Sequence, residues 1–156
     1  MHTYFAGVTW TRGGDAFLDQ KYSRGHRWTF DEGVTVPASA SPHIVPAPWT
    51  VAAAVDPEEA LVASVSSCHM LFFLSFASSA GFTVESYEDA AEGVLEKNAE
   101  GRDAMTRFTL RPSVSFKERA PSVEEFDDMH QLAHAKCYIA NSLKSAVVVE
   151  PVLRLA

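Results

Sequence analysis

Residues 56–74 have the sequence DPEEALVASVSSCHMLFFL, and the interpretation of the whole chain depends on this stretch. Its first residues carry the signals of a helix N-terminus. Asp56 can cap the helix, Pro57 suits the first helical position, and Glu59 can complete a capping box with Asp56. The helix that follows holds Cys68, one of only two cysteines in the chain. The question is whether Cys68 is a small core residue or a reactive sulfur.

The helix is expected to end before Gly81, because glycine suits the left-handed position that follows a helix C-terminus. It would then contain about 24 residues and be about 36 Å long. Residues 67–77 are apolar on nearly every face, which is typical of a helix that is buried all round. In a chain of this size, we expect such a helix to lie between sheets or at a subunit interface.

Composition and charge are those of an ordinary globular protein. The chain has 156 residues, of which 47% are apolar and 21% charged, and this length is enough for one domain with a substantial core. The net charge is −7 and Lys and Arg form no cluster, so we expect no nucleic-acid partner. We therefore expect a single domain over residues 1–156.

Two features bear on where the protein works. The N-terminal residues lack the basic and apolar regions of a secretory signal. The apolar segment 60–80 contains six serines and one histidine, so we expect it to be too polar to cross a bilayer. We therefore expect a cytoplasmic protein that has no membrane partner and whose two thiols are reduced at rest.

The residues before the helix predict strands and one long loop. Residues 3–11 favour a strand, and residues 16–36 favour a hairpin whose turn lies at the Asp-Glu-Gly sequence 31–33. The segment 37–55 contains four prolines and can be neither a helix nor a central strand. A connection of this length is often functional.

The residues after the helix predict two strands, a second helix and a last strand. Residues 83–97 and 105–116 favour strands joined by a polar turn. Ser122 and Glu125 form a second capping-box pattern, ahead of a helix expected over residues 123–144. The final eleven residues favour a strand. This order of elements predicts an α+β fold.

The two cysteines leave several alternatives open. Free cysteine is often an inert, buried residue, and a reactive Cys68 would need a nearby cation to stabilise its thiolate. His69 points about 100° away from Cys68 on a helix, so we do not expect it to act as a base for the thiol. His130, His134 and Cys137 share one helix face and could bind zinc. Two cysteines are too few for a disulfide scaffold or a four-cysteine zinc site.

The segments around both cysteines resemble the signatures of the OsmC/Ohr family of thiol peroxidases. The first signature is a proline-glutamate pair that opens a long helix, here Pro57-Glu58, with a cysteine ten residues after that glutamate, here Cys68. The second is a later helix with a cysteine preceded by a histidine or lysine, here Ala133-His134-Ala135-Lys136-Cys137. The resemblance covers essentially all of the chain, and the expected order of elements agrees with it.

The resemblance implies an α+β, OsmC-like fold with antiparallel-rich sheets and two long, central, cysteine-bearing helices in an intertwined homodimer. The implied activity is the reduction of organic hydroperoxides in oxidative stress defence. Cys68 would become a sulfenic acid, and Cys137 would resolve it by closing a disulfide. The resemblance implies no metal and no bound cofactor, but an external dithiol or lipoylated protein as reductant. Met70, Phe72 and Phe73 are expected to line an apolar pocket.

The resemblance also implies an activating arginine, in the loop before the proline-glutamate pair or in the early hairpin. Residues 37–55 contain neither Arg nor Lys, so Arg24 is the expected residue and Arg27 the alternative. A guanidinium stays charged when partly buried and can stabilise a thiolate and a developing alkoxide. Glu58 would orient it. Because Glu58 and Cys68 are roughly 15 Å apart along an unbroken helix, this requires a bent helix or an exchange between subunits.

Two other functions are compatible with the same residues. One is a binding or stress-associated protein that keeps the OsmC fold but has little turnover. The other is a metal-binding protein that uses His130, His134 and Cys137.

Overall fold

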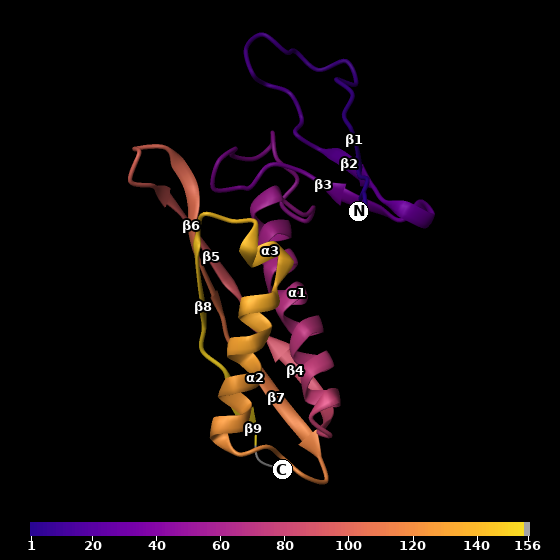
Figure 1. The fold of residues 1–156 in the computed structure, drawn as a ribbon. Helices are drawn as coiled ribbons and strands as arrows, with labels where there is room; N and C mark the ends of the chain where they lie inside the picture. Colours follow the sequence, from indigo (N-terminus) through magenta and orange to yellow (C-terminus); the bar gives the residue numbers. More distant parts are fainter. Residues whose placement is uncertain (155–156) are drawn as a thin grey trace. The chain divides into compact units, whose positions relative to one another are not determined.

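The computed structural model describes residues 1–154 and contains two compact units, Met1–Ala60 and the residues from Leu61 onward (Figure 1). The first unit holds a three-stranded sheet, and the second holds two further three-stranded sheets and the paired helices. The expectation of a single domain over residues 1–156 stays a prediction.

The sheet of the first unit is antiparallel, with the strand order β1-β2-β3. Its strands are β1 (Gly7–Thr9), β2 (His26–Thr29) and β3 (Thr35–Ala38). The short 3-10 turn η1 (Asp31–Gly33) joins β2 to β3, so the predicted hairpin turn is confirmed. The predicted strand over residues 3–11 is shorter than expected.

The proline-rich segment is an ordered loop that returns to β3. The Ser39 N–H donates to the Val55 carbonyl at 3.0 Å, and the Val55 N–H donates to the Pro37 carbonyl at 3.1 Å. The buried Thr50 hydroxyl lies 3.2 Å from the Ser39 hydroxyl. The loop is therefore closed at its base, and it delivers the chain to the start of the first helix.

Helix α1 (Pro57–Ser79) begins and ends where the sequence predicted. The Glu59 N–H donates to the Asp56 carboxylate at 2.8 Å, and the Asp56 N–H donates to the Glu59 carboxylate at 3.3 Å, which completes the capping box. At the other end Gly81 has φ of 80°, and the Phe82 N–H donates to the Ala77 carbonyl at 2.9 Å. Glycine is favoured there because the left-handed conformation has no Cβ clash.

Burial of α1 on every side is not found within the single chain. One stripe with a spacing of four residues is buried, namely Val65, His69, Phe73 and Ala77. Leu71, on another face, is 63% exposed. By length and composition alone α1 could cross a membrane, so its serine content does not exclude a span as the sequence analysis expected. Its buried stripe packs as a core helix does.

The second unit contains a long hairpin that is broken at the same level in both strands. Strands β4 (Thr83–Asp89) and β7 (Pro112–Lys117) pair in one sheet, and β5 (Glu92–Lys97) and β6 (Asp103–Leu110) pair in the next. At the break, the Asp89 carboxylate accepts the Arg111 N–H at 2.7 Å. The predicted pairing is confirmed, but each predicted strand is two strands.

The C-terminal segment also contributes to both sheets. Strand β8 (Ala146–Val149) pairs parallel to β6, and β9 (Val152–Arg154) pairs parallel to β7. Pro151 lies between them and cannot donate a backbone hydrogen bond, so the single expected strand is divided there. The last two residues of that expected strand lie outside the described residues.

Helix α2 (Val123–Lys136) starts with the predicted capping box of Ser122 and Glu125. The predicted end of this helix at residue 144 is wrong, because α2 ends at Lys136. Cys137 has ψ of 110°, which turns the chain, and a short helix α3 (Tyr138–Asn141) follows. The Cys137 sulfur accepts the Ala140 N–H at 3.4 Å and so caps α3.

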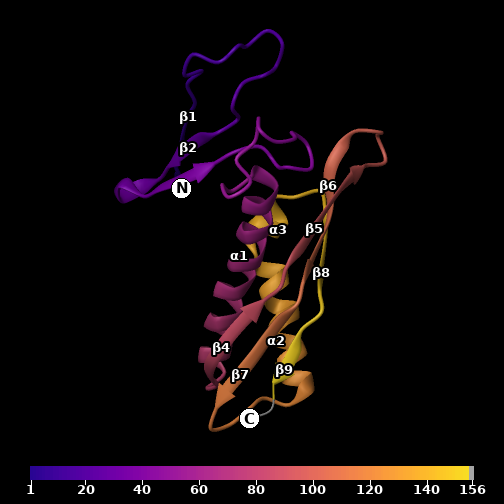
Figure 2. The ribbon, with the colours of Figure 1, turned by 180° about the vertical axis from the view of Figure 1, so that it is seen from behind.

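In the second unit, α1 and α2 lie side by side on one face of the strands, as opposite views show (Figures 1 and 2). Close packing is visible at Gly93 of β5, where an added Cβ would lie 2.7 Å from Val62 of α1. Phe73 of α1 and Phe126 of α2 meet edge to face, with ring centroids 5.8 Å apart. The core of the second unit therefore lies between the helices and the strands.

Candidate functional site

The structure brings the two cysteines together from different elements of the second unit. Cys68 lies half-buried in the middle of α1, and Cys137 is 1% exposed at the junction of α2 and α3. Both are free thiols. The break in the second helix positions Cys137, because the sulfur replaces a backbone acceptor at the start of α3.

The surroundings of Cys137 raise the pKa of its thiol. Burial raises the pKa of Cys137 to about 11, and its hydrogen bond and charge interaction with Cys68 add to the rise, while the N–H groups of Ala140 and Ile139 act in the opposite direction. Cys137 is therefore a protonated thiol at neutral pH. Cys68 therefore lies close enough to Cys137 to act on the pKa of its thiol.

Cys68 borders an open hollow of about 420 Å³ between α1 and α3. The wall is mainly apolar, with Leu71 and Phe72 on one side and Tyr138 and Ile139 on the other. Tyr138 meets Phe72 edge to face, with ring centroids 5.0 Å apart. Serines complete the lining, namely Ser64, Ser67 and Ser75. An apolar hollow beside a half-buried thiol can take a molecule with an apolar body and place its polar end at the sulfur.

Of the residues expected to line an apolar pocket, Phe72 is one that does. Met70 and Phe73 do not line it, and Phe73 is instead fully buried in the core of the second unit. Tyr138 and Ile139 were missed by the sequence analysis, because they reach the hollow only after the chain turns at Cys137. This turn depends on the extended backbone conformation of Cys137, and the sequence around Cys137 contains no residue that predicts it.

Arg24 belongs to the first unit, where it is held by an aromatic ring and by carbonyls. Its guanidinium lies 3.8 Å from the centroid of the Tyr22 ring, and it donates to the carbonyls of Gln20 at 2.7 Å and Tyr22 at 2.6 Å. Within residues 1–154 the structure gives Arg24 no salt bridge. The expected contact with a carboxylate is therefore absent from the first unit as described.

Arg24 also borders a hollow of about 500 Å³ within the first unit, together with Trp10, Phe17, Tyr22 and His26. Glu58 is half-buried in the first turn of α1, and Arg27 is exposed on β2. Of the four predicted site residues, Cys68 and Cys137 lie near each other in the second unit. Arg24 and Glu58 belong to the first unit.

The sequence analysis missed a pair of buried histidines. His69 Nε2 lies 2.9 Å from His130 Nδ1, and the two rings are stacked with centroids 5.3 Å apart and planes 4° from parallel. The side chains are 1% and 2% exposed. Burial lowers the pKa of His69 to about 4 and that of His130 to about 3, so both imidazoles are neutral at pH 7. The available signal was the four-residue spacing of Val65, His69 and Phe73.

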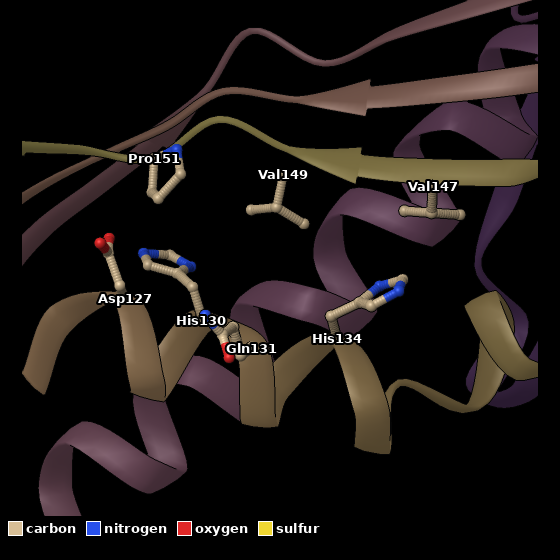
Figure 3. A pocket seen from close by; sticks show the side chains of 7 residues that line it. All are labelled: Asp127, His130, Gln131, His134, Val147, Val149 and Pro151. Atoms are coloured by element: carbon tan, nitrogen blue, oxygen red, sulfur yellow. The ribbon is translucent and has the colours of Figure 1, made fainter. Parts of the chain in front are cut away.

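His130 also reaches a slot of about 360 Å³ between α2 and the segment from β8 to Pro151 (Figure 3). Figure 3 shows His130 and His134 projecting from α2 towards Val147, Val149 and Pro151. Residues 1–154 contain no group of three His, Cys, Asp or Glu side chains placed to hold a metal ion. His130 directs Nδ1 to His69, and the metal set of the rival interpretation, His130, His134 and Cys137, is not assembled among these residues.

Comparisons with known proteins agree with this geometry. The family model described as OsmC-like protein matches residues 51–152, which include both cysteines. The chain belongs to the OsmC-like family. The structure is also similar to that of an OsmC-like protein of unknown function from Vibrio cholerae, with 50% sequence identity and a TM-score of 0.96 over 97% of this chain and 100% of that one. The predicted family and the OsmC-like α+β fold are confirmed.

Two more distant structures share the OsmC-like fold. An organic hydroperoxide resistance protein from Elizabethkingia anophelis has 17% identity and a TM-score of 0.72, over 100% of this chain and 98% of that one. The organic hydroperoxide resistance protein OhrB of Bacillus subtilis has 17% identity and a TM-score of 0.60, over 98% of each chain. Among curated proteins, none matches this chain.

Proposed function

We propose that this OsmC-like protein is a cysteine-based peroxidase that reduces organic hydroperoxides to alcohols in oxidative stress defence. The observation that carries the proposal is the proximity of two free thiols, through which Cys68 raises the pKa of Cys137, together with the apolar hollow that Cys68 borders. Family membership supports it, because the fold is shared with proteins described as organic hydroperoxide resistance proteins.

The reaction has two steps on the protein. The Cys68 thiolate attacks the terminal oxygen of the hydroperoxide, an S–O bond forms, the O–O bond breaks, and the alkoxide takes a proton and leaves as the alcohol. The Cys137 sulfur then attacks the Cys68 sulfenic acid, an S–S bond forms, and the oxygen leaves as water. Cys137 stays protonated until this step, because burial holds its pKa at about 11.

We assign Arg24 as the cation that favours the Cys68 thiolate and stabilises the leaving alkoxide, with Glu58 as its orienting carboxylate and Arg27 as the alternative cation. A guanidinium is the right group, because it stays charged in a partly buried site. The cycle needs no bound cofactor. It ends when an external dithiol, such as a lipoylated protein, reduces the disulfide in the cytoplasm.

The active form is proposed to be a homodimer. Leu71 is 63% exposed and Tyr138 is 72% exposed, although both border the Cys68 hollow. Cover from a second copy would complete the apolar wall and bury the exposed face of α1. We expect neither a membrane nor a nucleic acid as a partner, since the chain carries a net charge of −7.

The test is a count of free thiols on reduced protein before and after one equivalent of cumene hydroperoxide. Wild type should lose both thiols within seconds and gain the mass of a disulfide. The Cys137→Ser variant should stop at a sulfenic or over-oxidised Cys68, and Arg24→Ala should react slowly while Arg27→Ala reacts normally. If both wild-type thiols survive minutes of exposure, the peroxidase proposal is wrong, and the hollow serves binding alone.

A further inference from the structure

The hydrogen bond between His69 and His130 joins the two helices that carry the cysteines. His69 follows Cys68 directly on α1, and His130 lies seven residues, about two helical turns, before Cys137 on the α2 side. We propose that this imidazole pair holds α1 and α2 at the spacing at which Cys68 and Cys137 can form a disulfide. His69 and His130 are then positioning residues for the resolving step, an inference that rests on the proposed function.

The surroundings of the pair explain why it fixes the position of the helices. Phe73 stacks on His130 with ring centroids 4.1 Å apart, and Phe126 meets His130 edge to face at 4.6 Å. Apolar contacts are non-directional, so they constrain the relative position of two helices less sharply than a hydrogen bond does. The His69–His130 hydrogen bond is the one that the pair makes, and its loss would leave all four ring nitrogens buried without a partner.

The chain transmits this constraint to the sulfurs. Cys68 shares the rigid middle of α1 with His69, so a displacement of the helix moves both residues together. Cys137 cannot move freely to follow such a displacement, because its sulfur accepts a hydrogen bond from the Ala140 N–H and its side chain is buried. A disulfide accepts only a narrow range of separations and torsion angles, and a small change in helix spacing therefore opposes its formation.

The pair acts through position and not through charge. Both rings are neutral, with pKa values lowered by burial to about 4 and about 3, so neither supplies a cation to the Cys68 thiolate at pH 7. In the pair, one ring donates its N–H and the other accepts it. Each ring therefore has one nitrogen committed to its partner, and the hydrogen bond joins Nε2 of His69 to Nδ1 of His130.

This atom assignment defines a matched pair of variants. Asn at position 130 places a polar atom near the position of Nδ1, whereas Gln places it near Nε2. His130→Asn should therefore keep a hydrogen bond to His69, and His130→Gln should lose it. His130→Leu and His69→Leu remove the bond outright. Gln131→Leu makes a similar change on the neighbouring, exposed position of α2 and serves as the control.

The measurement is the equilibrium between the reduced protein and the Cys68–Cys137 disulfide in glutathione buffers of known ratio. We expect the equilibrium constant for disulfide formation to fall about tenfold in His130→Gln and in both Leu variants, which corresponds to about 30 mV. His130→Asn should stay near wild type, as should Gln131→Leu. Thermal melts identify any variant that is unfolded, and the Asn and Gln variants carry the test if the Leu variants do not fold.

The positioning proposal is overturned if folded His130→Gln and His130→Asn give the same equilibrium constant, or if the Leu variants match wild type. The peroxidase proposal fails separately. If hydroperoxide leaves the wild-type thiols intact while the glutathione equilibrium still depends on the pair, positioning stands and the peroxidase assignment falls. If hydroperoxide oxidises the thiols but the equilibrium ignores the pair, only the positioning role falls.

Discussion

At the residue scale, the two cysteines differ because their backbones differ. Cys68 lies inside a regular helix and borders a hollow, whereas Cys137 sits at a helix junction with its sulfur turned to the backbone of α3. Burial and the neighbouring thiol both favour the protonated form of Cys137. The division of labour in the proposed reaction, with a half-buried nucleophile that borders a hollow and a buried resolving thiol, follows from these positions.

This difference predicts selective alkylation. With iodoacetamide at pH 8, Cys68 should be modified first, and Cys137 at least about tenfold more slowly, because it is buried and its thiol is protonated. Peptide mass spectrometry at short times measures both sites. Cys68→Ser should remain almost unlabelled over the same period, and equal labelling of both cysteines in native wild type would contradict the prediction.

A second prediction at this scale concerns acid. Burial lowers the pKa values of His69 and His130 well below 6.5, with His134 lowering and Asp89 raising that of His69. Below pH 6.5 the unfolded state binds protons that the folded state does not, so stability falls as pH drops towards about 4. Each histidine should contribute a slope of about 1.4 kcal/mol per pH unit in that range.

Urea unfolding at a series of pH values measures this slope. The double variant His69→Gln with His130→Asn has no titrating ring at either position and keeps polar atoms where the hydrogen bond is made. Its unfolding free energy should depend less on pH between 6.5 and 4 than that of wild type. Identical slopes for the two proteins would show that the buried pair does not govern acid stability.

At the scale of elements, local signals were predicted well and tertiary ones were not. Both helix starts were found, because a capping box is built from residues three apart. The end of α2 was missed, because the turn at Cys137 depends on the packing of α3 and on the sulfur cap. The break shared by the two long strands was also missed, since Asp89 and Arg111 meet only after the hairpin has formed.

The cysteines and the histidine pair of the site differ in the same way. The cysteine positions were read from sequence spacing, but the facing of His69 and His130 across two helices required the structure. In the sequence His130 paired naturally with His134, one turn away on the same helix. In the fold its Nδ1 is directed to the other helix, because that face of α2 carries the core residues Phe126 and Ala133.

The capping box of α2 gives a prediction for an element. Ser122→Ala removes the acceptor of the Glu125 N–H and should lower the free energy of unfolding by about 1 kcal/mol. Ser122→Gly should cost less, since glycine is tolerated at this position. Chemical denaturation measures both. A smaller loss for alanine than for glycine would mean that the cap does not stabilise the helix in the way its hydrogen bonds indicate.

At the scale of the whole molecule, each of the two units leaves large apolar side chains exposed. In the first unit Tyr4 is 87% exposed and Phe5 is 73% exposed, and in the second unit Leu71 and Tyr138 are largely exposed. Large exposed apolar groups in a chain with net charge −7 favour a specific apolar partner over an electrostatic one. A second copy of the chain is the partner proposed above for the face of α1.

A second copy of the chain as partner implies a dimer in solution that depends on the exposed face of α1. Wild-type protein should sediment at twice the mass of one chain at micromolar concentration, and Leu71→Lys should shift it towards a monomer, because the lysine would place a charge in the apolar contact. Lys144→Leu, a change on an exposed residue outside that face, is the control and should leave the mass unchanged. Loss of dimer in Leu71→Lys should also slow hydroperoxide reduction, since the wall of the Cys68 hollow would stay open to water. A monomeric wild type with full activity would show that the hollow works without a second copy.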